Sequence, residues 1–382
     1  DAGDVTLNAS GDLTLGDVNV SGSLQVTSAT NLLMSGTVMV AALDAKATAG
    51  SISQGAQGEL QVTSGPADLE AATDITLANA SNDFSGVLNA NGMNVTLTDS
   101  LNGLTLGDIN ASGQLNVSSN GVLDLSGTVA VDSLALSSSA GSITQSAGSL
   151  TVKQGASQLE TAGDISLTQS NTFGGLVQVA DAGDVTLNAS GDLTLSDVNA
   201  SGRLQVTSAA DLLLNGVVTV AALDAKATAG SISQGTQGQL QVTSGPTDLE
   251  AAMDITLANA SNDFSGVVNA NGVNVTLSDS LNGLTLGDIN ASGQLSVSSK
   301  ALLDLSGTVA ADSLALSSST GSITQSAGSL TVNQGTSQLE AAGDITLTQS
   351  NSLGDLVQVA NASAVTLNAS GDLTLSDVNA SG

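Results

Sequence analysis

The chain is organised around residues 1–19, which read Asp-Ala-Gly-Asp-Val-Thr-Leu-Asn-Ala-Ser-Gly-Asp-Leu-Thr-Leu-Gly-Asp-Val-Asn. Nearly the same residues return at 181–199 and again at 361–379. Each copy contains two short alternations of apolar and polar residues, Val5-Thr6-Leu7 and Leu13-Thr14-Leu15, separated by a small polar segment. Such alternation, interrupted by small polar residues, predicts a strand, a corner and a second strand. Because the stretch recurs at a fixed spacing, it is the unit of a repeat architecture.

Two nested repeats run through the chain. Residues 1–180 and 181–360 align without gaps and differ at 29 positions, while residues 361–382 begin a third copy. Each long repeat contains two half-repeats of about 90 residues, since Ser51-Ile52-Ser53-Gln54 corresponds to Ser142-Ile143-Thr144-Gln145. A repeat protein grows by adding units and needs no separate cores. We therefore predict a single continuous β-helix over residues 1–382.

A finer step predicts the fold class. Strand-like triplets recur about every 18 residues, as in Val5-Thr6-Leu7, Leu24-Gln25-Val26 and Leu43-Asp44-Ala45. Helix is disfavoured because no apolar stripe has helical spacing and Ser, Thr, Asn, Gly and Val dominate. The prediction is an all-β fold, a parallel β-helix or β-solenoid of about 21 rungs that stack ~4.8 Å apart.

The predicted core is thin and aliphatic. The only aromatic residues are Phe84, Phe173 and Phe264, and Leu353 takes their place in the last half-repeat. Since Leu replaces Phe there, we interpret this position as an inward-facing one that large apolar side chains fill. The structural core ladder is expected to include Val5, Leu7, Leu13, Leu15, Leu24, Val26, Ile52, Leu69, Ile75, Leu77, Phe84, Phe173, Phe264 and Leu353.

Composition excludes several classes of function. Five basic residues face 35 acidic ones, for a formal net charge of −30. Nucleic acids and anionic membranes are poor partners for such a chain, because both are bound through clusters of Lys and Arg. The chain has no His and no Cys, which removes Ser–His and Cys–His nucleophile pairs and disulfides. No apolar run is long enough for insertion into a membrane.

Paired carboxylates are the remaining enzymatic option, because polysaccharide-cleaving β-helices use them as acid and base. The acidic residues that recur at one position are Glu70, Glu160, Glu250 and Glu340. A catalytic site interrupts a repeat at one place, whereas these carboxylates belong to the repeat. We predict that the chain is not an enzyme and has no catalytic or cofactor-binding residues. An ice-binding solenoid is also disfavoured, because the outward series includes Gln25 and Asp44 instead of a regular row of Thr.

Repeated acidic residues at corners raise the question of metal binding. The weak candidates for metal ligands are Asp17, Asp108, Asp197, Asp288 and Asp377; a second series is Asp74, Asp164, Asp254 and Asp344. Calcium prefers clustered oxygen ligands, but the known calcium-binding nonapeptide and EF-hand patterns are absent. Asp and Asn side chains also cap corners by accepting hydrogen bonds from nearby backbone N–H groups. We favour capping, and expect no metal or cofactor beyond diffuse or weak Ca²⁺ binding.

Two further polar patterns recur. A Gln follows Ile in every half-repeat, at Gln54, Gln145, Gln234 and Gln325. We interpret these residues as a stacked amide ladder. Asn-x-Ser triplets such as Asn8-Ala9-Ser10 are potential glycosylation acceptors, but a chain this rich in Asn and Ser produces them by composition.

Several segments resemble filamentous-haemagglutinin-type exoproteins, the large adhesins of two-partner secretion in Gram-negative bacteria. The resemblance rests on residues 3–15, on Ala-Gly-Ser-Ile-Thr-Gln-Ser-Ala-Gly-Ser-Leu-Thr-Val at 140–152 and on Asn-Asp-Phe-Ser-Gly-Val at 82–87. It implies a right-handed parallel β-helix, export through an outer-membrane secretion partner, and a role in adhesion, biofilm formation or cell–cell contact. The family's secretion domain and its effector or anchoring domain have no counterpart in these residues.

These observations lead to an expected function. The chain is expected to be the shaft of an extracellular or cell-surface adhesin or filament, and an internal piece of a longer protein. The alternatives are the stalk of a contact-dependent inhibition toxin, a polysaccharide-active enzyme and an ice-binding solenoid. The expected partners are the outer-membrane secretion protein, an unknown surface receptor or matrix polysaccharide, and further copies in lateral or end-to-end filaments. Neither nucleic acid nor a membrane interior is an expected partner.

Overall fold

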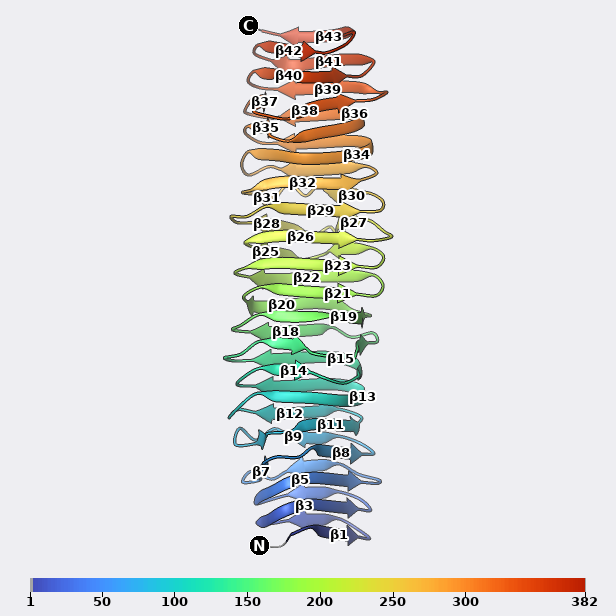
Figure 1. Cartoon of the computed structure of the whole chain (residues 1–382), viewed down its shortest axis with the longest axis vertical. Helices are drawn as coiled ribbons and strands as arrows, with labels where there is room; N and C mark the ends of the chain where they lie inside the picture. Colours follow the sequence, from blue (N-terminus) through green and yellow to red (C-terminus); the bar gives the residue numbers. More distant parts are fainter. Residues whose placement is uncertain (1–2, 382) are drawn as a thin grey trace. The chain divides into compact units, whose positions relative to one another are not determined.

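The computed structural model describes residues 3–381 and contains only strands, turns and bends. The chain divides into two compact units, the first ending at Ser190 and the second beginning at Gly191. In both units the strands follow one another as stacked coils (Figure 1).

The strands of the first unit are β1 (Val5–Ala9), β2 (Leu13–Leu15), β3 (Val18–Ser28), β4 (Leu32–Met34), β5 (Thr37–Ala47), β6 (Ile52–Gln54), β7 (Glu59–Val62), β8 (Ala67–Ala71), β9 (Ile75–Leu77), β10 (Asp83–Phe84), β11 (Val87–Gly92), β12 (Val95–Asp99), β13 (Leu104–Ser119), β14 (Leu123–Leu125), β15 (Val129–Ser138), β16 (Ile143–Gln145), β17 (Leu150–Val152), β18 (Ser157–Thr161), β19 (Ile165–Phe173), β20 (Leu176–Ala182) and β21 (Val185–Ala189).

The strands of the second unit are β22 (Leu193–Ala200), β23 (Arg203–Ser208), β24 (Leu212–Leu214), β25 (Val217–Val220), β26 (Ala222–Ala227), β27 (Ile232–Gln234), β28 (Gln239–Val242), β29 (Thr247–Ala251), β30 (Ile255–Leu257), β31 (Asp263–Phe264), β32 (Val267–Gly272), β33 (Val275–Asp279), β34 (Leu284–Ser299), β35 (Leu303–Leu305), β36 (Thr308–Ser318), β37 (Ile323–Gln325), β38 (Ser329–Val332), β39 (Thr336–Ala341), β40 (Ile345–Leu353), β41 (Leu356–Ala362), β42 (Val365–Ala369) and β43 (Leu375–Ala380).

Parallel pairing connects one residue of each coil with one residue of the next, and we call such a series of paired residues a column. In the first unit the members of one column, each in register with the next, are Leu13, Leu32, Ile52, Ile75, Val95, Leu115, Leu134, Ser157 and Val177. The residues 180 positions later, from Leu193 to Val357, form the same column in the second unit. The predicted all-β parallel solenoid is therefore confirmed, whereas its single continuous span over residues 1–382 stays a prediction.

The coils are longer than the sequence suggested. Successive members of the column in the first unit are 19 to 23 residues apart, and the two units together contain about 19 turns. The predicted 21 rungs of about 18 residues are thus too many, because successive triplets do not always stack on one another: Leu43 pairs with Ala67, 24 residues later, whereas the nearer Leu60 pairs with Val38. One of the longest coils separates Ile52 from Ile75 and contains the turn around Gly55 and the corner at Pro66.

Alternation within the strands places apolar side chains inside. Buried members of the expected core ladder are Leu15, Leu24, Val26, Ile52, Leu69, Ile75, Leu77, Phe84, Phe173, Phe264 and Leu353. The remaining three, Val5, Leu7 and Leu13, are half-buried. They belong to the first coil, where β1 and β2 pair with β3 and β4 on one side. A strand covered from one side buries less of each side chain, which explains their partial exposure.

Successive half-repeats do not place equivalent residues on the same face. Leu24 belongs to a column that runs through Val5, Leu43, Ala67 and Leu88. Its equivalent in the next half-repeat, Leu115, lies instead in the column that begins at Leu13. A half-repeat is therefore longer than four complete coils: after four coils the chain continues to the next face before the equivalent residue is reached. Equivalent outward residues consequently move to the neighbouring face of the unit.

Among the buried polar residues, Thr247 allows a stability prediction. The Thr247 hydroxyl is buried without a hydrogen-bond partner, while Ala67 occupies the same place in the first long repeat. Replacing Thr247 by Val is expected to stabilise the second unit by about 1 kcal/mol, since an unsatisfied buried polar group costs roughly that much or more. Denaturant unfolding followed by hydrogen exchange would measure the gain. The reciprocal change Ala67→Thr is the control, and a stabilising Ala67→Thr would contradict the explanation.

Candidate functional site

The corner carboxylates connect successive coils. Asp17 Oδ1 accepts a hydrogen bond from the backbone N–H of Thr37 at 3.0 Å, and Asp108 Oδ1 accepts one from Thr128 at 2.8 Å. Asp197 and Asp288 bind the N–H groups of Val217 and Thr308 in the same way. Asp377, with a φ of 51°, instead accepts from side chains of Ser376 and Gln358. Capping by Asp is thus present, but four of these five cap a residue 20 positions later in the next coil.

The second Asp series has the same role. Its members Asp74, Asp164, Asp254 and Asp344 each accept the backbone N–H of a residue 20 positions later. Two corner carboxylates of the first coil show the electrostatic effect of such bonds. The Ser23 backbone N–H lowers the pKa of the Asp4 carboxyl, and the Thr30 hydroxyl lowers that of Asp12. Hydrogen bonds to a carboxylate favour its ionised form, so the acceptor is kept available.

We predict that calcium is not needed for folding. Among residues 3–381 no group of three or more acidic side chains is arranged to hold a metal ion, and the repeated Asp residues already bind backbone N–H groups. Thermal melts followed by circular dichroism are expected to be the same in excess calcium and in excess chelator. A lower melting temperature in chelator that Asp17→Asn and Asp108→Asn abolish would contradict the prediction and make these residues ligands.

The recurring Glu residues lie on the outer surface. Lys46 Nζ is 2.7 Å from Glu70 Oε2, and Lys226 makes the same ion pair with Glu250 in the second unit. Glu340 accepts a hydrogen bond from the Asn361 amide. Within the stack Glu70 lies between Lys46 and Asn91, so its neighbours in the adjacent coils are a cation and an amide. Catalysis by a facing carboxylate pair receives no support from this arrangement, and the absence of enzymatic activity stays a prediction.

An acidic groove lies around Glu70 and recurs in the second unit. We define it by the outward residues Asp44, Asp68, Glu70, Asn89, Asn91, Asp108 and Asn110, which line a hollow of about 470 Å³ in the first unit. The residues 180 positions later line a hollow of about 520 Å³ in the second unit. Asp44 and Asp68 are direct neighbours in the stack, a juxtaposition of like charges that weakens strand pairing.

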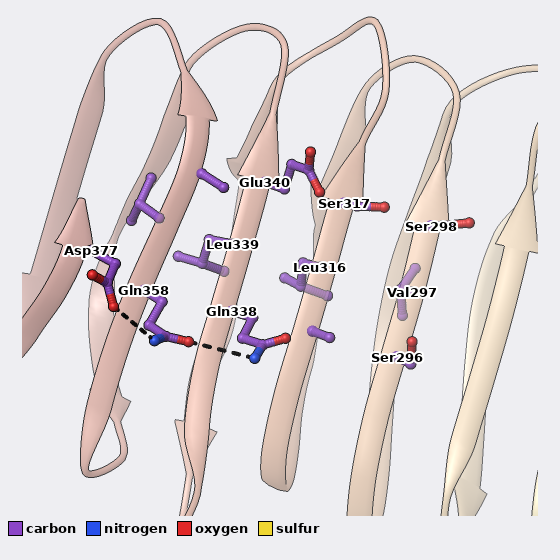
Figure 2. A pocket seen from close by; sticks show the side chains of 13 residues that line it. Ser296, Val297, Ser298, Leu316, Ser317, Gln338, Leu339, Glu340, Gln358 and Asp377 are labelled. Carbon is purple, nitrogen blue, oxygen red and sulfur yellow. Dashed lines mark hydrogen bonds between the residues drawn. The ribbon is translucent and has the colours of Figure 1, made fainter. Parts of the chain in front are cut away.

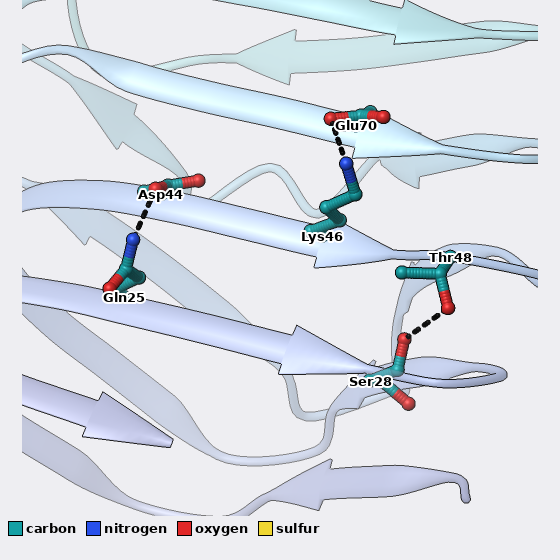
Figure 3. A network of polar contacts seen from close by, with 6 residues as sticks. All are labelled: Gln25, Ser28, Asp44, Lys46, Thr48 and Glu70. Atoms are coloured by element: carbon teal, nitrogen blue, oxygen red, sulfur yellow. Dashed lines mark hydrogen bonds and ion pairs between the residues drawn. The ribbon is translucent and has the colours of Figure 1, made fainter. Parts of the chain in front are cut away.

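Amide groups offset part of this repulsion. Gln25 Nε2 donates to Asp44 Oδ2 at 3.0 Å, and Asn89 Nδ2 donates to Asp68 Oδ1 at 2.7 Å. Figure 3 shows the Gln25–Asp44 and Lys46–Glu70 contacts on neighbouring coils. In the second unit Arg203 pairs with Asp224, which occupies the position of Asp44. The groove is therefore an acidic surface whose carboxylates accept hydrogen bonds from the chain's own amides and whose charge is partly neutralised by its cations.

The equivalent surface of the last half-repeat is less charged. A hollow of about 350 Å³ is lined by Ser298, Ser317, Gln338, Glu340 and Gln358, with Asp377 at its end. Figure 2 shows the side chains of Gln338, Gln358 and Asp377 in a row across adjacent coils. Gln358 Nε2 donates to Asp377 Oδ2 at 3.2 Å. Ala315 and Gln338 thus take the positions of Asp44 and Asp68, whereas Glu340 keeps the carboxylate of Glu70.

The four Gln residues do not form a stacked ladder, so that interpretation is wrong. Gln54 Nε2 donates to Asn82 Oδ1 at 2.6 Å, and Asn82 Nδ2 donates back to Gln54 Oε1 at 3.0 Å. We call this reciprocal pair an amide plug. The other amide plugs are Gln145–Asn171, Gln234–Asn262 and Gln325–Asn351. The available signal was an Asn that recurs 26 or 28 residues after each Gln.

Sequence reasoning also missed a buried carboxylate. Asp99 is fully buried and accepts backbone N–H bonds from Phe84, Leu101 and Asn102 at 2.9 to 3.1 Å. Asp279 makes the equivalent bonds in the second unit. Ala189 follows the same Val-Thr-Leu motif in the other half-repeat. Ala at this position in one half-repeat indicates that the position faces inward. That replacement was the signal that could have distinguished Asp99 from the solvent-exposed acidic residues.

Comparison with known proteins places the chain in a family. A family model described as repeats of unknown function (DUF5649) matches residues 2–47, 29–91, 92–132, 119–180, 182–222, 210–271 and 298–360. The chain belongs to this family. The DUF5649 matches that begin at residues 29, 119, 210 and 298 follow the half-repeat, since their starts are about 90 residues apart. No curated protein and no solved structure matches the chain.

The DUF5649 repeats are built here from strands alone. In the part of the chain that the structure describes, no helix has the length and apolar character needed to cross a membrane. The family match and the solenoid together establish a repeat-region protein.

Proposed function

We propose that this chain is the shaft of a secreted or cell-surface adhesin of a Gram-negative bacterium, which holds a binding module away from the cell. The observation that supports this proposal is the unbroken column of paired residues from Leu13 to Val177, which recurs 180 positions later. Every coil in such a column is joined to the next by backbone hydrogen bonds. Because each coil contacts mainly its neighbours, a stack of this kind grows in one direction as coils are added.

The shaft lengthens by whole repeats. Each coil adds ~4.8 Å along a parallel stack, and one 180-residue repeat contains between eight and nine coils at the observed spacing. One repeat then contributes about 40 Å of reach. Corner Asp residues add a side-chain bond between coils, as Asp17 does to Thr37. Near-identity of the two long repeats lets recombination change the reach without a change of fold.

The acidic surface is compatible with an exported segment that does not associate with neighbouring shafts. The net charge of −30 favours solubility and mutual repulsion of parallel shafts. Export through an outer-membrane secretion partner is part of the proposal, and it is supported by the resemblance of residues 3–15, 82–87 and 140–152 to filamentous-haemagglutinin-type exoproteins. Binding of a receptor or matrix polysaccharide is assigned to a module outside these residues, because the outward side chains of the acidic groove recur with the 180-residue repeat and so do not form a surface found at one place alone.

The proposal is tested in the producing bacterium by removing residues 181–360 from the adhesin. We expect surface display to persist, the shaft in electron micrographs to shorten by about 40 Å, and adhesion to fall only where a shorter reach matters. The purified chain of 382 residues is the second arm and is expected not to compete for adhesion. If the purified chain blocks adhesion at saturation, it is a binding module and the shaft proposal fails.

A further inference from the structure

The amide plugs lie where the backbone ladder between two coils stops. Strand β6 pairs with β9 only at Ile52↔Ile75 and Ser53↔Thr76, so Gln54 has no partner in β9. The same interruption follows the second residue of β16, β27 and β37. One coil earlier Gln54 is in register with Met34, an apolar core residue. Each half-repeat therefore contains one polar group in an otherwise apolar position, at the point where two strands separate.

The plug satisfies backbone groups that the separated strands leave without ladder partners. Gln54 Oε1 accepts the N–H of Asn79 at 3.1 Å, and Asn82 Oδ1 accepts the N–H of Leu60 at 3.0 Å. Asn82 Nδ2 also donates to the Leu77 carbonyl at 3.1 Å. The other half-repeat has the same bonds, from Gln169 and Leu150 to its own plug. Asn82 is fully buried, and its amide donates and accepts two bonds each.

The apolar alternation does not determine which residues of adjacent coils pair. A shift by one residue turns every apolar side chain outward and is strongly opposed, whereas a shift by two keeps the inside and outside of each strand. Around the plug the strands read Ile-Ser-Gln and Ile-Thr-Leu, so a two-residue shift still places apolar side chains inside. The coil between β6 and β9 is one of the longest, and its corner residues can change conformation to permit such a shift. Something other than hydrophobicity must specify the pairing here.

We propose that the amide plugs set the register between the coils that flank them. A two-residue shift of β9 along β6 moves the Asn79 N–H by about 7 Å, beyond reach of Gln54 Oε1. The buried amides of Gln54 and Asn82 would then lack partners in apolar surroundings, which opposes the shift. Single buried polar residues specify pairing in coiled coils by the same physics. One plug in each half-repeat resets the pairing of near-identical coils about every 90 residues.

Engineered cysteines test the proposal, because the chain has none of its own. Ser53 and Thr76 face outward as direct neighbours, and S53C with T76C is expected to cross-link in the native register. S53C paired with A78C or with D74C reports a shift by two residues in either direction. The three reporter pairs are compared in the full chain and in the variant Gln54→Leu with Asn82→Leu. The control variant Asn116→Leu with Gln158→Leu removes two exposed amides elsewhere in the first unit.

In the otherwise unchanged chain and in the control, only the native pair is expected to cross-link. In the variant without the plug, we expect a shifted pair to gain yield severalfold at the expense of the native pair, with the strand signal in circular dichroism retained. If only the native pair, S53C with T76C, cross-links in a folded variant, the proposal is overturned. The plug would then satisfy hydrogen bonds without setting the register. If the double variant does not fold, the three cysteine pairs are compared in the single variant Gln54→Met. This change keeps the bonds of Asn82 to Leu60 and Leu77, and unaltered cross-linking there would also overturn the proposal.

Discussion

Replacing Leu97 by Asp is expected to unfold the coils around β12 in the first unit. Leu97 is fully buried and in register with Leu77 in one neighbouring coil and Val117 in the other. The change removes a packed aliphatic side chain and buries a carboxylate without a partner, for a combined loss of about 4 kcal/mol or more. Since coils contact mainly their neighbours, protection from hydrogen exchange should fall in β9, β12 and β13 and persist in distant coils.

The matched control for Leu97→Asp is Thr96→Asp on the same strand. Thr96 points outward, and its neighbours in the stack are Thr76 and Asn116, both uncharged. An added carboxylate stays hydrated there, so the free energy of unfolding should change by no more than about 0.5 kcal/mol. Equal damage from the two substitutions would show that the assignment of inward and outward positions on β12 is wrong.

Replacing Asp99 by Ala is expected to have the second-largest effect. One buried carboxylate binds the N–H groups of Phe84, Leu101 and Asn102, and its removal deprives all three donors of this acceptor. The bond from the Phe84 N–H is buried, whereas Leu101 and Asn102 are exposed residues whose N–H groups donate part-buried bonds. Loss of a buried bond costs about 1 to 3 kcal/mol and loss of each part-buried bond about 1 kcal/mol, so we expect a total loss of about 3–5 kcal/mol. Chemical denaturation of the full chain gives the loss, and hydrogen exchange locates it. Asp279→Ala should produce an equal loss in the second unit.

Asp108→Ala separates this effect from ordinary corner capping. Asp108 is exposed, and its carboxylate binds the single N–H of Thr128. Water can replace an exposed acceptor, so the expected loss is about 1 kcal/mol, as for a helix cap. The explanation of Asp99 fails if the two Ala variants are equally stable, because burial of the Asp99 acceptor and its two additional bonds would then have no measurable consequence.

The amino-acid sequence by itself determined the fold class and the side of each strand that is buried. The alternation in Leu13-Thr14-Leu15 and its recurrence at a regular step specify strands that stack in parallel, because only that arrangement buries every copy. Leu15 is buried and Thr14 is exposed, as the alternation requires. Replacement of Phe by Leu353 also identified a core position, since a side chain that varies only in apolar size is one that packs.

Only the tertiary structure showed in which coil each polar side chain finds its hydrogen-bond partner. Asp17 binds Thr37 in the next coil, because stacking places residues 20 positions apart within hydrogen-bond distance of one another. The length of the coils follows from corner residues that carry no periodic signal, and it moves Leu115 to a different face from Leu24. The partners of Gln54 and Asp99 depend on where the strands separate, and the backbone N–H groups left there are visible only once the coils are stacked.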